Sequence, residues 1–232
     1  MWQAVRTQLR PKGIEIVTVA LDTGGADAAR PWIEAAKPEH PSLIDVAHSL
    51  GELLGVVNVP NAVWIDEHGM IVRPAEPAWP GSTPVTEMFS TPNDVELPPA
   101  MVAVREELAR MHIDPERYLT MLLDWAEKGA DSQYVLPPDQ VVERSQPRSF
   151  DAARAAAHFE LGQHVHLAGD HEAAIPHWRE AHRLQPENWT YKRQAWNLES
   201  SDTVTGSAAY EGSWLGDVRA IGAENYYPVI QP

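Results

Sequence analysis

The chain of 232 residues contains no cysteine. It can therefore form no disulfide, offer no thiolate to a metal ion and carry out no thiol catalysis with its own side chains. Long apolar stretches are also absent, since no run approaches the roughly 20 residues that a membrane-spanning helix needs. The apolar part of the N-terminus is too short for a signal peptide. We therefore expect a cytoplasmic protein with no membrane partner.

Basic side chains are scarce. The sequence has 18 lysines and arginines against 33 aspartates and glutamates, a formal net charge of −15. Nucleic acids and anionic membranes bind to basic surfaces, so this balance argues against both as partners. Thr23-Gly24-Gly25 is too short for a phosphate-binding loop, and no serine or threonine stands in a nucleophile-elbow pattern. The sequence predicts no cofactor.

The first third of the chain does contain an alternation of helix and strand signals. Met1, Val5 and Leu9 are spaced as on one face of a helix, which Pro11 ends. The near-continuous apolar stretch 14–21 is typical of a strand buried on both faces. Further elements follow in this order: a helix at 26–36, an extended piece at 42–45, a helix at about 45–54, and strands at 61–66 and 70–73. This order predicts an α/β fold with right-handed crossovers.

The rest of the chain is expected to be irregular and then helical. Residues 74–99 hold seven prolines and should form an arm packed on the surface through Trp79 and Phe89. We expect the C-terminal tail to dock onto the body of the protein through its aromatic residues Trp214, Tyr226 and Tyr227. Helices are predicted within 100–129 and at about 150–168, 170–184 and 187–199, with a loop at 130–149. The predicted divisions of the chain are 1–98, a helical linker region at 99–149, a helical hairpin plus capping helix at 150–199, and a docking tail at 200–232.

Three stretches near the N-terminus share their order and spacing with one family. They are Gly13-Ile14 to Leu21-Asp22, Leu54-Gly55-Val56 to Val59-Pro60, and Ile65-Asp66-x-x-Gly69-x-Ile71-Val72. In these residues the segment 13–73 resembles the redoxin group of the thioredoxin superfamily, the TlpA/ResA-like and peroxiredoxin-like (AhpC/TSA-type) proteins. The resemblance implies that residues 1–98 form an N-terminally truncated thioredoxin-like α/β domain. It also implies that Pro60 is a cis-proline and that Val59 and Pro60 bind the backbone of a peptide or thiol substrate. The alternative is that Pro60 simply begins an edge strand.

The sequence also departs from this family. The family places the strand that delivers its Cys-x-x-Cys motif between the strands at 14–21 and 62–66, and this chain has neither that strand nor that motif. Without the strand the sheet would split and leave two facing edges, and each buried unpaired backbone group costs about 1–3 kcal/mol. A total stability of about 5–15 kcal/mol hardly tolerates several such groups. Either another segment fills the slot or the protein starts further upstream.

We expect an upstream start, because Met1-Trp2-Gln3 resembles the middle of the helix that follows the family's dithiol. Some redoxins carry selenocysteine at a redox position, and gene finding that takes its codon for a stop would begin the protein at the next methionine. Stop codons in every upstream frame, with no segment coding for a dithiol, would contradict this hypothesis.

A second resemblance lies in the last third of the chain. Its residues are Ala157, Leu161-Gly162, Val165, Gly169-Asp170, Ala174, Trp178, Ala181, Leu184 and Pro186. At these offsets the segment 157–186 resembles one tetratricopeptide (TPR) repeat, and 187–199 would be its capping helix. The small residues Gly162, Ala174 and Ala181 would let two antiparallel helices approach closely. Because single repeats rarely stand alone, this hairpin should pack on the helices of 100–129 or on a partner chain.

Other candidate residues carry no clear chemistry. Six of the ten histidines lie between 158 and 182, and His164 and His166 together with Asp170 and His171 could suggest a metal site. His164 and His166 point to different sides of a helix, however, so we predict solvated helix faces and no metal site. Asp22 and Asp66 follow strands and are expected to cap turns. Nothing in the sequence fixes the geometry of a possible acid–base set of Glu34, Glu39 and His40. We therefore predict no catalytic residue in the chain as written.

Two functions stay open. One is a redoxin-type enzyme, a thiol–disulfide oxidoreductase or thiol peroxidase whose redox-active segment lies upstream of these residues. The other is a non-catalytic thioredoxin-like and TPR adaptor. Both would engage a protein or peptide partner through the proline loop and the TPR-like region, and oligomers are possible.

Overall fold

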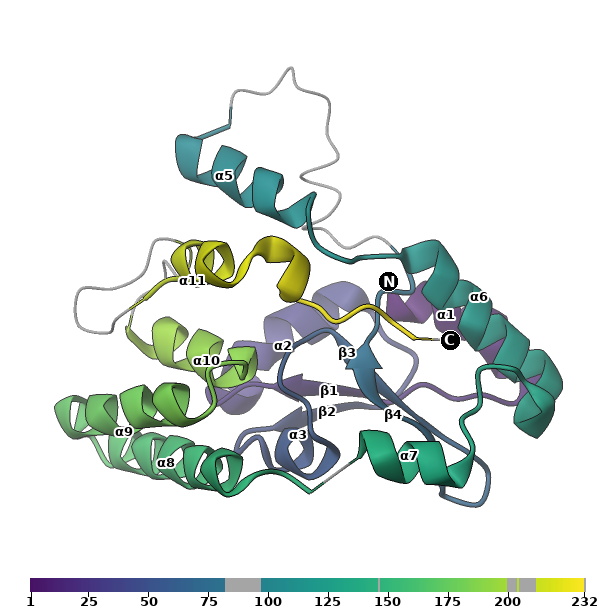
Figure 1. The fold of residues 1–232 in the computed structure, drawn as a ribbon, viewed down its shortest axis with the longest axis horizontal. Helices are drawn as coiled ribbons and strands as arrows, with labels where there is room; N and C mark the ends of the chain where they lie inside the picture. The colour runs from purple at the N-terminus through teal and green to yellow at the C-terminus, as the bar shows by residue number, and fades with distance from the viewer. Residues whose placement is uncertain (82–96, 146, 200–203, 205–211, 232) are drawn as a thin grey trace. The chain divides into compact units, whose positions relative to one another are not determined.

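The computed structural model describes residues 1–81, 97–145, 147–199, 204 and 212–231. The chain is of mixed α/β class, mostly helical, with small sheets near the N-terminus and a helical C-terminal region (Figure 1). It divides into two compact units. The first comprises Met1–Gly81, Asp114–Ser149 and Ile230–Pro232, and the second comprises Ser82–Ile113 and Phe150–Val229. The segment expected as one linker, 99–149, is thus shared between both units. No described helix is long and apolar enough to cross a membrane.

The N-terminal unit alternates helices and strands in the predicted order. Its elements are α1 (Trp2–Leu9), β1 (Thr18–Leu21), α2 (Gly25–Ala36), β2 (Ser42–Asp45), α3 (Ser49–Leu54), β3 (Asn61–Ile65), β4 (Ile71–Pro77), α6 (Pro115–Lys128) and α7 (Pro138–Arg144). The predicted strand 14–21 is too long, because β1 pairs only along the four residues that face β2. The predicted loop 130–149 is wrong at α7, where Pro138 is the first helical residue, a position that needs no backbone donor.

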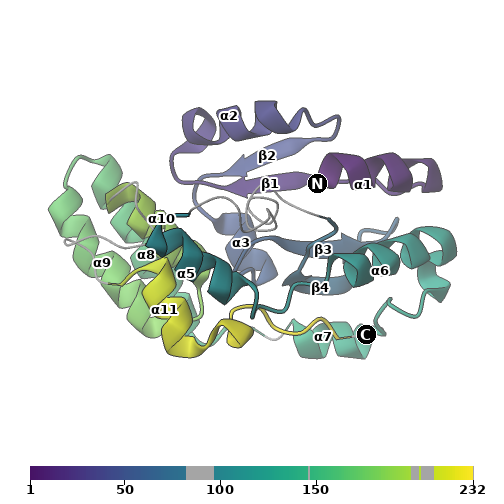
Figure 2. The same cartoon turned by 90° about the horizontal axis from the view of Figure 1, so that it is seen from above.

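The strands of this unit form two separate pairs. β1 runs parallel to β2, with Thr18 opposite Ser42 and Leu21 opposite Asp45. β3 runs antiparallel to β4, with Asn61 opposite Pro77. No strand in the described ranges joins β1 to β3, so the strands form two sheets, divided at the place that the resemblance implies. Figure 2 shows the two pairs as distinct ribbons.

The core of the N-terminal unit is centred on Trp64 of β3, which is 2% exposed. Its ring stacks on Trp125 of α6 with centroids 4.8 Å apart, and its Nε1 donates to the hydroxyl of Tyr118 at 3.0 Å. The fully buried guanidinium of Arg73 lies over the same ring, 5.5 Å from the centroid. Arg73 also pairs with Glu76 and donates to the carbonyls of Tyr134 and Gln231. Helix α6 and the C-terminal residues are therefore part of this core.

The second unit is helical throughout its described residues. It contains α5 (Pro99–Leu108), α8 (Phe150–Leu167), α9 (His171–Leu184), α10 (Trp189–Glu199), α11 (Trp214–Ile221) and a 3₁₀ turn at Ala223–Asn225. The helices α8 and α9 lie side by side as a hairpin (Figure 1). A Cβ added to Gly162 would lie 2.6 Å from the ring of Trp178, and Ala174 and Ala181 are fully buried. The close approach predicted for these small residues is confirmed.

The aromatic tail packs within this second unit. Tyr226 and Tyr227 are each 3% exposed. The ring of Tyr226 lies edge-on to Trp189 of α10 at 4.6 Å, and its hydroxyl accepts a hydrogen bond from Trp214 Nε1 at 3.0 Å. The predicted docking role of these aromatic residues is confirmed, whereas α11 was not predicted. In the proline-rich arm Trp79 is buried, and Phe89 lies outside the described residues.

Candidate functional site

The candidate site is the space between the two strand pairs of the N-terminal unit. β1 pairs with β2 along one of its edges, and β3 pairs with β4 along one of its edges. A cavity of about 1030 Å³ is lined by the continuous stretches 12–21 and 59–67, which contain these two strands. This volume is at the upper end of the range of about 300–1,000 Å³ that is usual for ligand pockets. The cavity therefore lies against both β1 and β3.

Apolar side chains dominate the lining. Trp2 and Leu9 come from α1, and Leu122 and Trp125 come from α6. Val17 and Ile65 also line the cavity, and they are 53% and 50% exposed although each lies in or next to a strand. Val17, which belongs to the stretch 14–21 that was predicted to be buried on both faces, is thus half exposed. Roughly 25 cal/mol is gained for each Å² of such surface that is covered, so an apolar occupant would be stabilised here.

Two acidic groups at the cavity, Glu15 and Asp66, are already engaged in hydrogen bonds. Glu15 accepts a hydrogen bond from Arg6 Nε at 2.6 Å, and this contact lowers the pKa of Glu15 to about 2. Asp66 accepts from the backbone amides of His68 at 2.9 Å and Met70 at 2.8 Å. The predicted turn role of Asp66 is confirmed, and neither carboxylate is available as a general base.

The proline loop lies at this cavity. Val59 and Pro60 are both lining residues, and the peptide bond between them is cis, as the resemblance implies. The carbonyl of Pro60 accepts a hydrogen bond from the amide of Ala78 at 3.2 Å, and β3 begins at the next residue, Asn61. The side-chain oxygen of Asn61 is buried without a hydrogen-bond partner in the described part of the chain. Binding of a substrate backbone by Val59 and Pro60 stays a prediction.

A buried histidine follows the carboxyl end of β2, and the sequence analysis did not single it out. His48 is 2% exposed and has a positive φ of 58°. Burial lowers the pKa of His48 to about 4, although the nearby carboxylates of Asp45 and Asp22 oppose this shift. Asp45 accepts from the amides of Ser49 and Leu50, and Asp22 accepts from Gly24, so the predicted turn role of Asp22 is confirmed. His48 is thus a neutral imidazole at neutral pH.

The possible acid–base set is not assembled. Glu39 pairs with Arg6, and Nδ1 of His40 contacts the carbonyl of Pro41. Within the described ranges no hydrogen bond or ion pair joins Glu34, Glu39 and His40.

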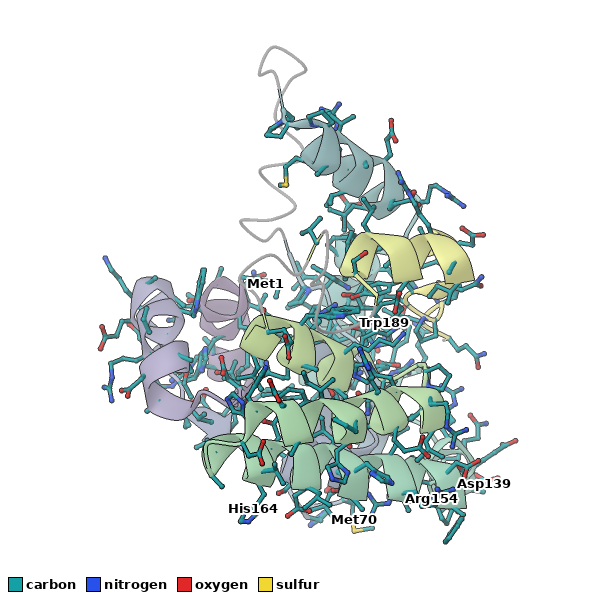
Figure 3. The ribbon with its side chains drawn as sticks, turned by 90° about the vertical axis from the view of Figure 1, so that its left-hand side faces the viewer. Met1, Met70, Asp139, Arg154, His164 and Trp189 are labelled. Atoms are coloured by element: carbon teal, nitrogen blue, oxygen red, sulfur yellow. The ribbon has the colours of Figure 1, made fainter. Side chains whose placement is uncertain are left out.

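The histidines of the second unit differ from the prediction. His164 is exposed on α8, as predicted, and Figure 3 labels it near one end of the hairpin. The other five between 158 and 182 are partly buried, so solvated helix faces are the wrong description for them. His158 contacts His177, and His166 contacts His171, because the hairpin turn brings the two helices together. In the described residues no three histidine, aspartate or glutamate side chains converge in a way that could hold a metal ion.

Comparison of the chain with protein-family models, with curated proteins and with solved structures found no match.

Proposed function

We propose that the N-terminal unit is a thioredoxin-like redoxin domain whose redox-active segment lies outside these 232 residues. The proposed activity is thiol–disulfide exchange or thiol-dependent peroxide reduction. The observation that carries the proposal is the apolar cavity between β1 and β3, two strands that each pair on one edge only in the described structure. A single further strand in this position would complete one sheet of five strands.

The chemistry of such a domain requires a nucleophile from elsewhere. Thiol exchange proceeds by attack of a thiolate on a disulfide sulfur, and this chain has no cysteine to supply either atom. A strand that fills the cavity would end close to Val59 and Pro60, since both residues line the same space. In this proposal the strand carries the cysteine or selenocysteine, and the proline loop holds the backbone of the substrate.

The second candidate function is that of an adaptor without catalysis. The same cavity would accept an extended peptide from a partner, which would add a strand by backbone hydrogen bonds. The helical second unit, with its close-packed α8–α9 hairpin, supports a role in protein binding. Its likeness to a TPR repeat is part of this proposal.

The intact mass of the protein isolated from its own cells separates the two functions. A mass several kilodaltons above 25.8 kDa, together with disulfide reductase or peroxidase activity of that longer protein, supports the redoxin. The 232-residue chain serves as the control and should be inactive in both assays. A mass of 25.8 kDa would contradict the redoxin proposal and favour the adaptor.

A further inference from the structure

The α8–α9 hairpin brings two histidine rings together at its closed end. His166 lies in the last turn of α8, and His171 is the first residue of α9. Between them the chain turns at Gly169, which has a φ of 93°, and Asp170 caps α9 by accepting the amide of Ala173 at 3.1 Å. The Nδ1 atoms of His166 and His171 are 2.8 Å apart.

The other ring nitrogen of His171, Nε2, lies within hydrogen-bond distance of a carboxylate. Nε2 of this ring lies 2.6 Å from Oε1 of Glu199, whose side chain is 4% exposed and comes from the end of α10. A carboxylate acceptor places the proton of a neutral imidazole on Nε2 and so leaves the lone pair on Nδ1. Proteins commonly orient metal-binding histidines in this way. The lone pair of His171 is thus directed toward Nδ1 of His166, which donates its proton to it in the metal-free chain, and a bound metal ion would take the place of this hydrogen bond.

The surroundings of the pair leave it reachable from solvent. Both rings contact Trp178, each with centroids 5.6 Å from the indole. The side chain of His171 is 36% exposed, which leaves a path for an ion from solvent.

We propose that His166 and His171 bind one divalent transition-metal ion of the zinc, copper and nickel class through their Nδ1 atoms, with Glu199 orienting His171. Imidazole nitrogen suits these ions, whereas magnesium and calcium take oxygen ligands. Water would supply the remaining ligands, because the described residues offer no third protein side chain at this point. We therefore expect moderate rather than tight affinity.

A second histidine pair in the same hairpin provides a matched control. The Nδ1 atoms of His158 and His177 are 3.1 Å apart, which is a similar separation. In the described part of the chain no carboxylate accepts a hydrogen bond from either of these rings. If the orienting carboxylate matters, zinc should select the His166–His171 pair.

The test is isothermal titration of the full chain with zinc chloride, with magnesium chloride as the negative control. We expect one zinc ion per chain. His166→Asn and His171→Asn should abolish binding, and Glu199→Gln should weaken it about 10- to 100-fold. His158→Asn should leave the affinity unchanged. The circular dichroism spectrum of each variant shows whether the hairpin is folded.

Nitrogen NMR of the imidazole rings of the unsubstituted chain gives a readout that does not depend on any variant. Zinc should shift the Nδ1 signals of two rings and leave the proton of His171 on Nε2. The proposal is overturned if zinc does not bind, if His166→Asn binds it normally, or if His158→Asn lowers the affinity as much as His166→Asn does.

Discussion

Several polar side chains of the N-terminal unit are buried in its interior. Arg73 has no exposed surface, yet its guanidinium is paired with Glu76 and contacts two backbone carbonyls. In the same core, Nε1 of Trp64 donates a hydrogen bond to the hydroxyl of Tyr118. His48 is buried in its neutral form. Because an unpaired buried polar group costs about 1–3 kcal/mol, substitutions of Arg73, Trp64 or Tyr118 should be strongly destabilising.

Arg73→Met should lower the free energy of unfolding of the N-terminal unit by about 3–5 kcal/mol, because it leaves the carboxylate of Glu76 buried without its partner. Urea unfolding followed by tryptophan fluorescence measures this change. Arg10→Met is the control, since the Arg10 side chain is 64% exposed and its Nε lies 4.0 Å from Glu15. The control should change stability by less than about 0.5 kcal/mol. A loss below about 1 kcal/mol for Arg73→Met would contradict the anchoring role.

His48 should make the N-terminal unit less stable in acid. Its pKa is about 4 in the folded chain, against 6.5 ordinarily, so the unfolded chain binds more protons between these values. Stability therefore falls as the pH drops from 6.5 toward 4, by on the order of 3 kcal/mol in total.

His48→Asn should remove this part of the pH dependence, and asparagine tolerates the positive φ of the position. The measurement is the urea midpoint at pH 7 and at pH 4.5 for both proteins. Equal losses in the two proteins would show that His48 does not titrate in this way.

At the scale of the elements, packing is closest between α8 and α9. Gly162 on α8 allows the ring of Trp178 on α9 to lie against the backbone, and both are buried. In the N-terminal unit the strands behave differently, since β1 and β3 each lack a second neighbour among the described strands. The two helices of the hairpin thus bury their facing sides against each other, whereas β1 and β3 are each paired along one edge only within the described ranges.

Gly162→Ala should destabilise the helical unit by about 1–3 kcal/mol, because the new methyl group would lie 2.6 Å from the Trp178 ring. Thermal unfolding followed by circular dichroism measures the loss. Glu160→Ala, at an exposed position of the same helix, is the control and should have little effect. The double variant Gly162→Ala/Trp178→Phe should lose less than the sum of the single losses. Strict additivity would argue against this contact.

At the scale of the whole molecule, each unit is built from segments that are far apart in the chain. The N-terminal unit needs α6 to cover Trp64 and the C-terminal residues to accept from Arg73. The second unit joins α5 to α11 through Glu107, which pairs with Arg219 at 2.8 Å. The chain therefore passes more than once between the two units.

A fragment of residues 1–98 should fail to fold cooperatively, because it lacks Tyr118 and Trp125, which pack on Trp64. Its tryptophan emission should be red-shifted relative to the full chain, and its urea transition should be broad. A sharp transition with the midpoint of the full chain would show that 1–98 is an independent domain.

The net charge of −15 predicts that the full chain does not bind DNA. Fluorescence anisotropy of a labelled duplex at low salt should stay unchanged up to high micromolar protein. Binding that weakens as salt is added would contradict this prediction.

The sequence by itself determined the local features of this protein. Apolar periodicity, turn residues and small residues predicted most helices and strands, the close α8–α9 hairpin and the turn roles of Asp22 and Asp66. The split between β1 and β3 was expected from the family resemblance. The local features depend on residues that are close to one another in the chain, so the order of residues is enough to predict them. The start of α7 at a Pro-Pro pair was missed because proline signals loops as well as helix starts.

Only the tertiary structure decided which distant residues meet. Burial of His48, the contacts of Arg73 and the triad of His166, His171 and Glu199 all join residues whose spacing carries no signal. The cavity likewise arises from two stretches about 45 residues apart in the chain. Such contacts follow from how whole elements pack, since side chains far apart in sequence become neighbours only when the backbone between them is folded.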